Sequence, residues 1–125
     1  MATIIRSGID IIELDRLEKS NSRHGDRFLN RIFTSQELVD CGGKIESLAA
    51  RFAAKEAASK ALGCGIGQVS WQEIEITRNL DHQPELILHG AAQMLAKKLK
   101  LTIWSVSLSH TYQNAIAMVI ASGEN

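Results

Sequence analysis

The sequence is poor in the residues that mark flexible linkers, disulfide frameworks and zinc sites. Only one of its 125 residues is proline, two are cysteines, and aromatic residues make up 5% of the chain. Cys41 and Cys64 lie far apart without CxxC spacing, which argues against a zinc site or a disulfide framework. We interpret both thiols as packing residues in a protein of the reducing cytoplasm.

The sequence also lacks an excess of one charge and a long apolar run. Fourteen Lys and Arg residues balance fourteen Asp and Glu residues, so no global field recruits nucleic acid or an anionic membrane. The longest apolar run, residues 115–121, is far shorter than the roughly 20 residues that span a bilayer. The first residues do not resemble a secretory signal. We expect one cytoplasmic domain over residues 1–125, with neither nucleic acid nor a membrane as a partner.

Hydrophobic periodicity predicts both helices and strands, with the strand pairs gathered late in the chain. The expected strands cover residues 4–12, 70–77, 84–89, 102–109 and 115–121. The expected helices cover residues 14–30, a segment from the capping box at 34–37 to the glycines at 42–43, residues 46–62 and residues 90–100. Turns at 79–82 and 110–114 join the last four strands into two hairpins. We therefore expect an α+β domain, an antiparallel sheet with helices packed on one face.

Glycine positions indicate where two of these helices break or end. Gly25, or residues 21–22, can interrupt the first helical segment. Gly63 follows the Ala-rich helix at the place of a left-handed C-cap. The glycine cluster 63–67 lacks the GK[ST] ending of a phosphate loop and follows a helix instead of preceding one. We interpret the cluster as helix termination followed by a turn.

Asp10 is a carboxylate in an expected strand made mostly of glycine and isoleucine. Alternation divides this strand into a face with Arg6, Gly8, Asp10 and Ile12 and a face with Ile5, Ser7, Ile9 and Ile11. The simplest interpretation of Asp10 is an exposed position on a half-buried sheet. The alternative is a place in a polar cleft or in an ion pair.

Glu56 lies in the Ala-rich helix, one turn before Lys60. A Glu–Lys pair at this spacing is an ordinary helix stabiliser, worth about 0.2–0.5 kcal/mol. The alternative is a ligand groove, because alanines leave room beside a crowd of polar side chains, namely Arg51, Lys55, Glu56, Ser59 and Lys60. If Asp10 and Glu56 meet, they supply two hard oxygen ligands for Mg²⁺, and the neighbouring cations face substrate phosphates. This combination suits phosphoryl-type transfer.

A stripe of basic residues recurs in the first helical segment. Its members follow one another at helical spacing: Arg16, Lys19, Arg23, Arg27 and Arg31. On a continuous helix they form one face, which is either a solvated surface or a docking site for an acidic partner. The chain as a whole is not basic, which disfavours nucleic acid as that partner. His110, at the end of an expected strand, is either a surface residue or a ligand contact.

Several strings in the chain share their pattern with one protein family. Residues 8–16 read GIDIIELDR, which contains GxDIxExxR, and residues 51–63 read RFAAKEAASKALG, which contains RFAxKEAxxKAxG. Residues 27–37 contain RFxxRxxTxxE. These patterns resemble those of the holo-acyl-carrier-protein synthases, small 4'-phosphopantetheinyl transferases. Later positions follow the order of the family as well: residues 74–76, Pro84, Leu88, Gly90 and residues 107–110.

The resemblance implies an enzyme that transfers the 4'-phosphopantetheine arm of coenzyme A to a serine of apo acyl carrier protein and releases adenosine 3',5'-bisphosphate. Matched position by position, it implies Asp10 and Glu56 as Mg²⁺ ligands and Lys60 as a further catalytic residue. It implies coenzyme A contacts from Arg51, Ser59, Lys60, Gly63 and His110. It implies docking of the carrier protein on Arg16, Arg23 and Arg27. Members of this size form trimers whose active sites lie between subunits.

Some alternatives stay open beside the resemblance. A non-catalytic module that binds an acidic carrier protein through the basic stripe is the rival function. Glu56 and a metal-held water are both candidates for the base that accepts the serine proton. His82-Gln83 stands where the family often has Gly-Lys or Gly-Arg before the proline, and Cys64 replaces a common Thr or Lys. These departures bear on loop contacts and not on the pair of carboxylates.

Overall fold

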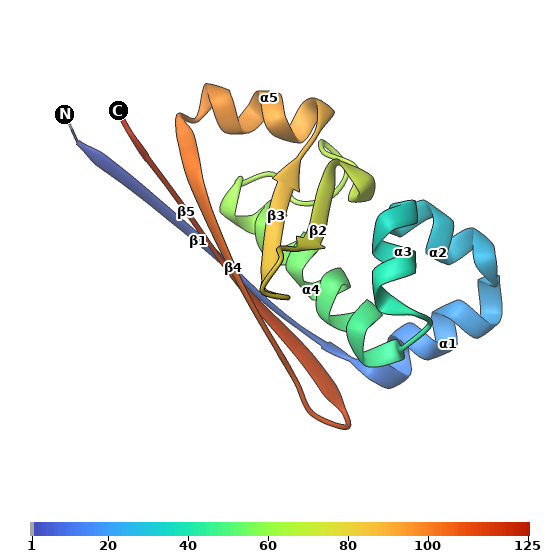
Figure 1. Cartoon of the computed structure of the whole chain (residues 1–125). Coiled ribbons are helices and arrows are strands. Elements are labelled where there is room, and N and C mark those ends of the chain that lie inside the picture. Colours follow the sequence, from blue (N-terminus) through green and yellow to red (C-terminus); the bar gives the residue numbers. More distant parts are fainter. Residues whose placement is uncertain (1) are drawn as a thin grey trace.

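The structure, a computed structural model, describes residues 2–125 of the chain. Its helices are α1 (Leu14–His24), α2 (Asp26–Ile32), α3 (Ser35–Cys41), α4 (Ile45–Ala61), the short 3-10 helix η1 (Trp71–Glu73) and α5 (Gly90–Lys98). Its strands are β1 (Thr3–Glu13), β2 (Ile74–Arg78), β3 (Pro84–Leu88), β4 (Leu101–His110) and β5 (Asn114–Glu124). The helices gather on one side of the long strands (Figure 1), so the expected α+β class is confirmed.

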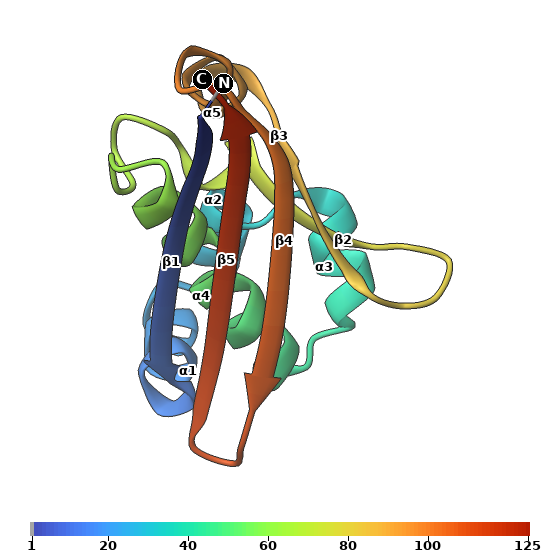
Figure 2. The same cartoon turned by 90° about the vertical axis from the view of Figure 1, so that its left-hand side faces the viewer.

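The strands form two antiparallel units. β5 lies between β1 and β4 in the larger sheet, and β2 pairs with β3 in a separate hairpin. Figure 2 shows β1, β5 and β4 side by side in front of the helices, with the β2–β3 hairpin next to β4. The expected pairing of the last four strands into two hairpins is confirmed.

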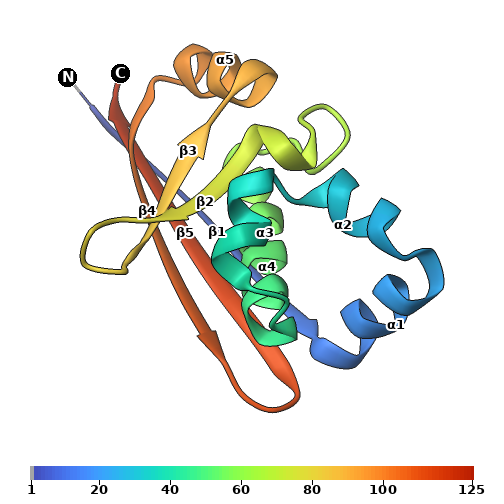
Figure 3. The same ribbon diagram turned by 45° about the vertical axis from the view of Figure 1, so that its right-hand side comes forward.

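The helix α4 lies between the larger sheet and α3 (Figure 3). Its buried side chains include a row of alanines: Ala53, Ala54, Ala57, Ala58 and Ala61. β1 approaches α4 so closely that a Cβ added to Gly8 would overlap the carbonyl oxygen of Ala57. Small residues on both elements therefore bring the two backbones together, which places Asp10, two residues after Gly8, beside α4.

The register of β1 decides which face each of its side chains occupies. Asp10 shares its face with Gly8 and lies on the α4 side, where it is half-buried. Ile5 and Ile11, on the opposite face, are 70% and 63% exposed. The division of the strand into two faces is thus confirmed, but the interpretation of Asp10 as an exposed alternate position is wrong. The isoleucines, and not the aspartate, occupy the open side of this sheet.

One expected helix break is confirmed, and one boundary differs from the sequence prediction for a local reason. The first helical segment breaks at Gly25, where a φ of 62° separates α1 from α2. The basic stripe therefore spans two helices and does not form one continuous face. Residues 71–73 form η1 instead of the start of a strand, because Ser70 and Glu73 make a capping box there. The capping box of Thr34 and Glu37 is confirmed as the start of α3.

Both cysteines have free thiols, Cys41 buried and Cys64 half-buried. Burial raises the pKa of each thiol, which keeps both in the unreactive protonated form. This agrees with the expected packing role. Within residues 2–125, no helix has both the length and the apolar character to cross a membrane.

Candidate active site

Asp10, Glu56 and Lys60 converge where β1 passes α4. Lys60 Nζ lies 3.3 Å from Asp10 Oδ1 and donates a hydrogen bond of 2.8 Å to the carbonyl oxygen of Ile9. The side chain of Lys60 is 53% exposed, so this ion pair is hydrated and weak. The ammonium group is therefore free to turn towards an incoming anion.

Glu56 lies close enough to Asp10 for the two carboxylates to interact. Partial burial and the negative charge of Asp10 raise the pKa of Glu56, while the ammonium of Lys60 opposes the shift. The sequence alone leaves open whether the two acids meet, and the fold brings them together. Two carboxylates in one half-buried place repel each other, and a divalent cation relieves that repulsion.

A cavity of about 360 Å³ opens beside the two carboxylates. Asp10 and Glu56 line it together with Arg16 of α1, and Phe28 and Phe52 form part of an apolar wall. The site therefore places charged groups next to a surface that excludes water. Nothing in the sequence pattern indicated this aromatic wall, apart from the position of Phe52 one helical turn before Glu56.

The donor set fits a magnesium ion. Within residues 2–125, His, Cys, Asp and Glu form no group of three or more that could enclose a metal. Asp10 and Glu56 offer hard oxygen ligands at an open cavity, and Mg²⁺ commonly takes one or two carboxylates while waters and substrate phosphates complete its shell. The pair therefore suits an ion that arrives with a phosphate-bearing substrate.

Arg51 and His110 lie on the other flank of α4. Asp10 is on the edge strand β1 and His110 on the edge strand β4, with β5 between them. Two strand spacings, together about 10 Å, separate these edges. Arg51 and His110 line a second cavity of about 240 Å³. Within one chain, the fold does not bring these two residues to the carboxylate pair.

Ser59 and Gly63 lie at the C-terminal end of α4, next to Lys60. Ser59 is fully buried, and its hydroxyl donates a hydrogen bond of 2.7 Å to the carbonyl oxygen of Glu56. Gly63 is exposed after the helix with a φ of 77°, and the guanidinium of Arg6 lies against it. Gly63 is accessible to a ligand, whereas the Ser59 hydroxyl faces the helix backbone.

The three arginines expected to dock a partner are exposed but divided between two helices. Arg16 and Arg23 lie on α1, and Arg27 lies on α2 beyond the break at Gly25. Arg16 lines the cavity beside the carboxylates. Arg23 lines a broad groove of about 800 Å³ along α1. Arg16 therefore connects the basic surface of α1 with the candidate site.

A buried ion pair behind the site is a feature that the sequence interpretation missed. Lys55 Nζ lies 2.7 Å from Glu37 Oε1, and both side chains are fully buried. The same ammonium donates to the carbonyl oxygens of Trp71 and Ile74. Burial lowers the pKa of Lys55, and Glu37 opposes this shift. Because Lys55 precedes Glu56, the pair holds the part of α4 that carries the Glu56 carboxylate.

Comparison with known proteins finds one family. The model of the 4'-phosphopantetheinyl transferase superfamily matches residues 6–117. A holo-[acyl-carrier-protein] synthase of Herpetosiphon aurantiacus is 48% identical over 124 residues, which cover 94% of this chain and 98% of the relative. The crystal structure of Helicobacter pylori holo-[acyl-carrier-protein] synthase in complex with coenzyme A has a TM-score of 0.85 and 36% identity, covering 92% of this chain and 98% of the other. The crystal structure of the synthase of Bacillus anthracis in complex with CoA (3',5'-ADP) has a TM-score of 0.80 and 38% identity. The match covers 98% of this chain and 100% of the other.

Proposed function

Because the chain belongs to the 4'-phosphopantetheinyl transferase superfamily, and within it to the holo-acyl-carrier-protein synthases, we propose that it transfers the 4'-phosphopantetheine arm of coenzyme A to a serine of apo acyl carrier protein. The products are holo acyl carrier protein and adenosine 3',5'-bisphosphate. The observation that carries the proposal is the meeting of Asp10, Glu56 and Lys60, with both carboxylates lining one cavity. The family consists of transferases, which decides against the non-catalytic binding module.

Asp10 and Glu56 would hold Mg²⁺ in this reaction. When bound, the ion supplies positive charge to the pyrophosphate of coenzyme A. Through their hold on the ion, Asp10 and Glu56 would orient the phosphate-bearing end of the substrate. Lys60 places an ammonium beside the phosphate oxygen that leaves, where it stabilises the developing negative charge. Phe28 and Phe52 keep water from the reacting end of the cavity.

The carrier protein docks on Arg16, Arg23 and Arg27 in this proposal. All three guanidiniums are exposed, which suits an acidic partner. Arg16 also lines the cavity beside Asp10 and Glu56. A carrier protein bound to α1 and α2 can therefore reach the carboxylate pair with its serine.

Coenzyme A contacts from Arg51, Lys60, Gly63 and His110 complete the proposed site in a homotrimer whose active sites lie between subunits, whereas the buried Ser59 makes no contact with the substrate. Arg51 and His110 lie across α4 from Asp10, so a neighbouring chain is needed to present them at the same site. The open face of the larger sheet supports assembly, because it exposes several large apolar side chains. They include Ile5, Ile9, Ile11, Ile103, Ile116 and Met118. An exposed apolar patch of this kind marks a protein interface.

We also propose that residues 1–125 form one domain that works in the cytoplasm. Two buried apolar clusters both include residues of α4, which suits a single folding unit. The free thiols of Cys41 and Cys64 suit a reducing compartment.

The test is the intact mass of apo acyl carrier protein after incubation with this protein, coenzyme A and Mg²⁺. We expect the carrier to gain the mass of one phosphopantetheine arm, and to gain nothing with EDTA or with Glu56→Ala. Glu85→Ala, which removes an exposed carboxylate from β3, is the matched control and should remain active. Carrier that binds without gaining mass would contradict the proposed transfer.

A further inference from the structure

The helix α2 carries part of the proposed carrier-docking surface but has little burial of its own to hold it in place. It has seven residues, and helices shorter than about 12 residues are marginal in water by themselves. Of these residues, all of which the structure describes, Ile32 alone is buried. Because Arg27 and Phe28 belong to this helix, their positions depend on contacts that other elements make with it.

Gln72, the middle residue of η1, closes the C-terminal end of α2. Its side-chain Nε2 donates hydrogen bonds to the carbonyl oxygen of Asn30 and, at 3.0 Å, to that of Phe33. Both partners are acceptors, so the amide NH₂ group and not the amide oxygen faces them. The last carbonyl groups of a helix have no partner within the helix, and here a side chain 42 residues away along the chain supplies one.

The other side of η1 is fixed to α4. The ring of Trp71 stacks on that of Phe52, with 4.7 Å between their centroids. The carbonyl oxygen of Trp71 accepts a hydrogen bond of 3.0 Å from Lys55 Nζ. Phe52 and Lys55 lie within the turn of α4 that precedes Glu56. The short helix η1 therefore links the C-terminal end of α2 to the part of α4 that carries Glu56.

This link bears on transfer because the carrier serine must meet the phosphate at one distance. A carrier protein docked on Arg27 moves with α2, whereas the phosphate-bearing substrate is held at Asp10 and Glu56 in the proposed site. Phe28 of α2 also lines the cavity beside those two carboxylates. A misplacement of about 1 Å can reduce a rate about a hundred-fold. A fixed connection between α2 and Glu56 therefore serves the reaction.

We infer that Gln72 is a positioning residue for the carrier protein, which fixes α2 and its docking residues relative to Glu56. The inference rests on the proposed function, since that function places the carrier protein on α1 and α2. Gln72 acts through α2, because its amide is bonded to the carbonyl oxygens at the end of that helix. Loss of this amide should weaken binding of the carrier protein and leave binding of coenzyme A unchanged.

The test variant is Gln72→Met, which keeps the length of the side chain and removes both amide donors. Gln72 is exposed, so the substitution leaves the core intact. Calorimetry gives the Kd for apo acyl carrier protein and for coenzyme A, each measured without the other substrate, so that no transfer is needed. Steady-state transfer gives the KM for both substrates. Hydrogen exchange of the Phe33 amide, which donates to the carbonyl oxygen of Leu29 at 2.9 Å, reports whether the end of α2 opens.

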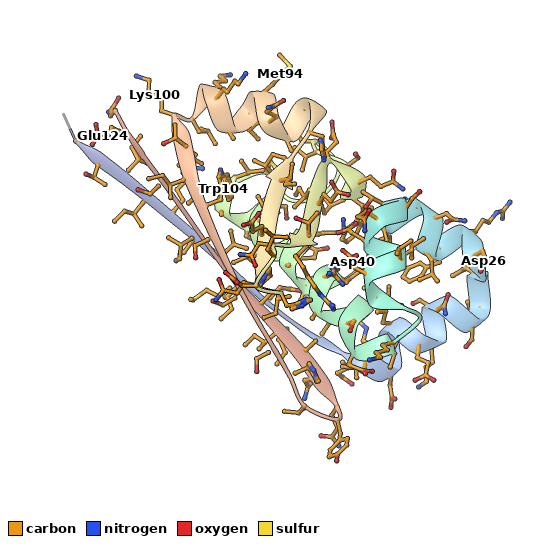
Figure 4. The ribbon with its side chains drawn as sticks, viewed as in Figure 1. Asp26, Asp40, Met94, Lys100, Trp104 and Glu124 are labelled. Carbon is orange, nitrogen blue, oxygen red and sulfur yellow. The ribbon has the colours of Figure 1, made fainter. Side chains whose placement is uncertain are left out.

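Gln36→Met is the matched control. The Gln36 amide donates a hydrogen bond of 2.9 Å to Asp40 Oδ1, and both residues lie on α3. Figure 4 shows Asp40 well apart from Asp26, the first residue of α2. The control removes an exposed amide and its hydrogen bond by the same substitution, without touching the link between η1 and α2. Any effect that comes only from replacing an exposed glutamine by methionine will appear in this control.

We expect Gln72→Met to weaken binding of the carrier protein roughly five-fold, with a matching rise in the KM for the carrier and faster exchange of the Phe33 amide. The Kd and KM for coenzyme A should stay the same, and Gln36→Met should match the wild type.

Unchanged affinity for the carrier protein would overturn the inference, even if the melting temperature fell, because Gln72 would then only stabilise the fold. An equal loss of affinity for both substrates would overturn it as well. If Gln72→Met weakens carrier binding but the wild type does not transfer the arm, the result would contradict the proposed function and support the positioning role of Gln72.

Discussion

Asp10 and Glu56 come from segments more than forty residues apart in the chain, and the close packing of Gly8 against Ala57 brings them together. Their proximity gives each residue a chemical environment that neither has alone. The negative charge of Asp10 raises the pKa of the Glu56 carboxyl group, and the positive charge of Lys60 lowers it. Substitutions at Asp10 and Lys60 can therefore separate the two influences.

The pKa of Glu56 in the metal-free protein should move in opposite directions in two variants. Asp10→Asn removes a negative charge and should lower this pKa, whereas Lys60→Met removes a positive charge and should raise it further. Titration of the Glu56 carboxyl carbon by NMR measures both shifts. Shifts of the same sign would show that the two side chains do not act on Glu56 through their charges.

The raised pKa of Glu56 also predicts how stability depends on pH and on the metal. Because this pKa is higher in the folded than in the unfolded protein, the contribution of Glu56 to stability is present at low pH and is lost as the pH rises through its folded value. Above that pH, Mg²⁺ should raise the melting temperature of the wild type and leave Glu56→Ala unchanged. Calorimetry measures the melting temperature of both proteins. An equal increase in the two melting temperatures would show that the ion binds elsewhere.

The sequence predicts which residues form the candidate site better than it predicts how exposed their side chains are. Asp10, Glu56 and Lys60 were predicted from residue types in specific strings, and the fold brings them together. That Ser59 and Arg51 are buried could not be predicted, because their exposure depends on which face of α4 meets α3 and β2. The same holds for Asp10, whose placement required knowledge of what covers each face of the sheet.

At the scale of elements, the buried Lys55–Glu37 pair joins α4 to α3 and, through backbone contacts, to β2. Lys55→Met leaves the Glu37 carboxylate buried without its cation, so we expect a loss of about 3–5 kcal/mol in the free energy of unfolding. Adding Glu37→Gln removes the unpaired charge and should restore part of that loss. Urea denaturation of both single variants and the double variant measures the coupling.

Lys97→Met is the control for that series, because it removes an exposed lysine from α5. It should change the free energy of unfolding by no more than about 0.5 kcal/mol. If the losses of Lys55→Met and Glu37→Gln simply add in the double variant, the two side chains do not stabilise the fold as a pair.

Most elements could be predicted because periodicity and caps act locally. The Ala-rich α4, the alternating β1 and the capping box of Thr34 all give local signals. Residues 71–73 misled the prediction, since their alternation resembles a strand while the Ser70–Glu73 capping box holds them in η1. The stripe of arginines forms one face only on a continuous helix, and Gly25, one of the two expected interruptions, divides it.

At the scale of the whole molecule, the open face of the larger sheet predicts assembly. Ile103 is 65% exposed on this face, opposite Ser122 in the register. Ile103→Lys should convert the proposed trimer into monomers and reduce transfer, because a charge is costly in an apolar interface. Light scattering after size-exclusion chromatography gives the mass of the assembly formed by the wild type and by Ile103→Lys.

Met94→Lys is the matched control for Ile103→Lys, because Met94 is 72% exposed on α5 and outside that face. It should leave the assembly intact. A wild type that is monomeric and active would contradict the proposed arrangement.

The resemblance implies active sites between subunits, but the sequence could not show which residues lie on which flank of α4. Asp10 and His110 both follow motif patterns, and only the strand order, with β5 between β1 and β4, shows that they lie across α4. The proposed requirement for two chains rests on this topology combined with the exposed apolar face. Neither feature can be identified from a string of residues.

Mixing two defective variants is the most direct test of an active site shared between subunits. Asp10→Ala removes a carboxylate from one flank of α4, and His110→Ala removes the imidazole from the other. Each variant alone should transfer little phosphopantetheine at low coenzyme A concentration. After dissociation and joint reassembly in equal amounts, transfer should recover to roughly a quarter of the wild-type rate, because that share of sites in a cyclic assembly combines two intact halves. No recovery in assemblies proven to contain both variants would contradict the shared site.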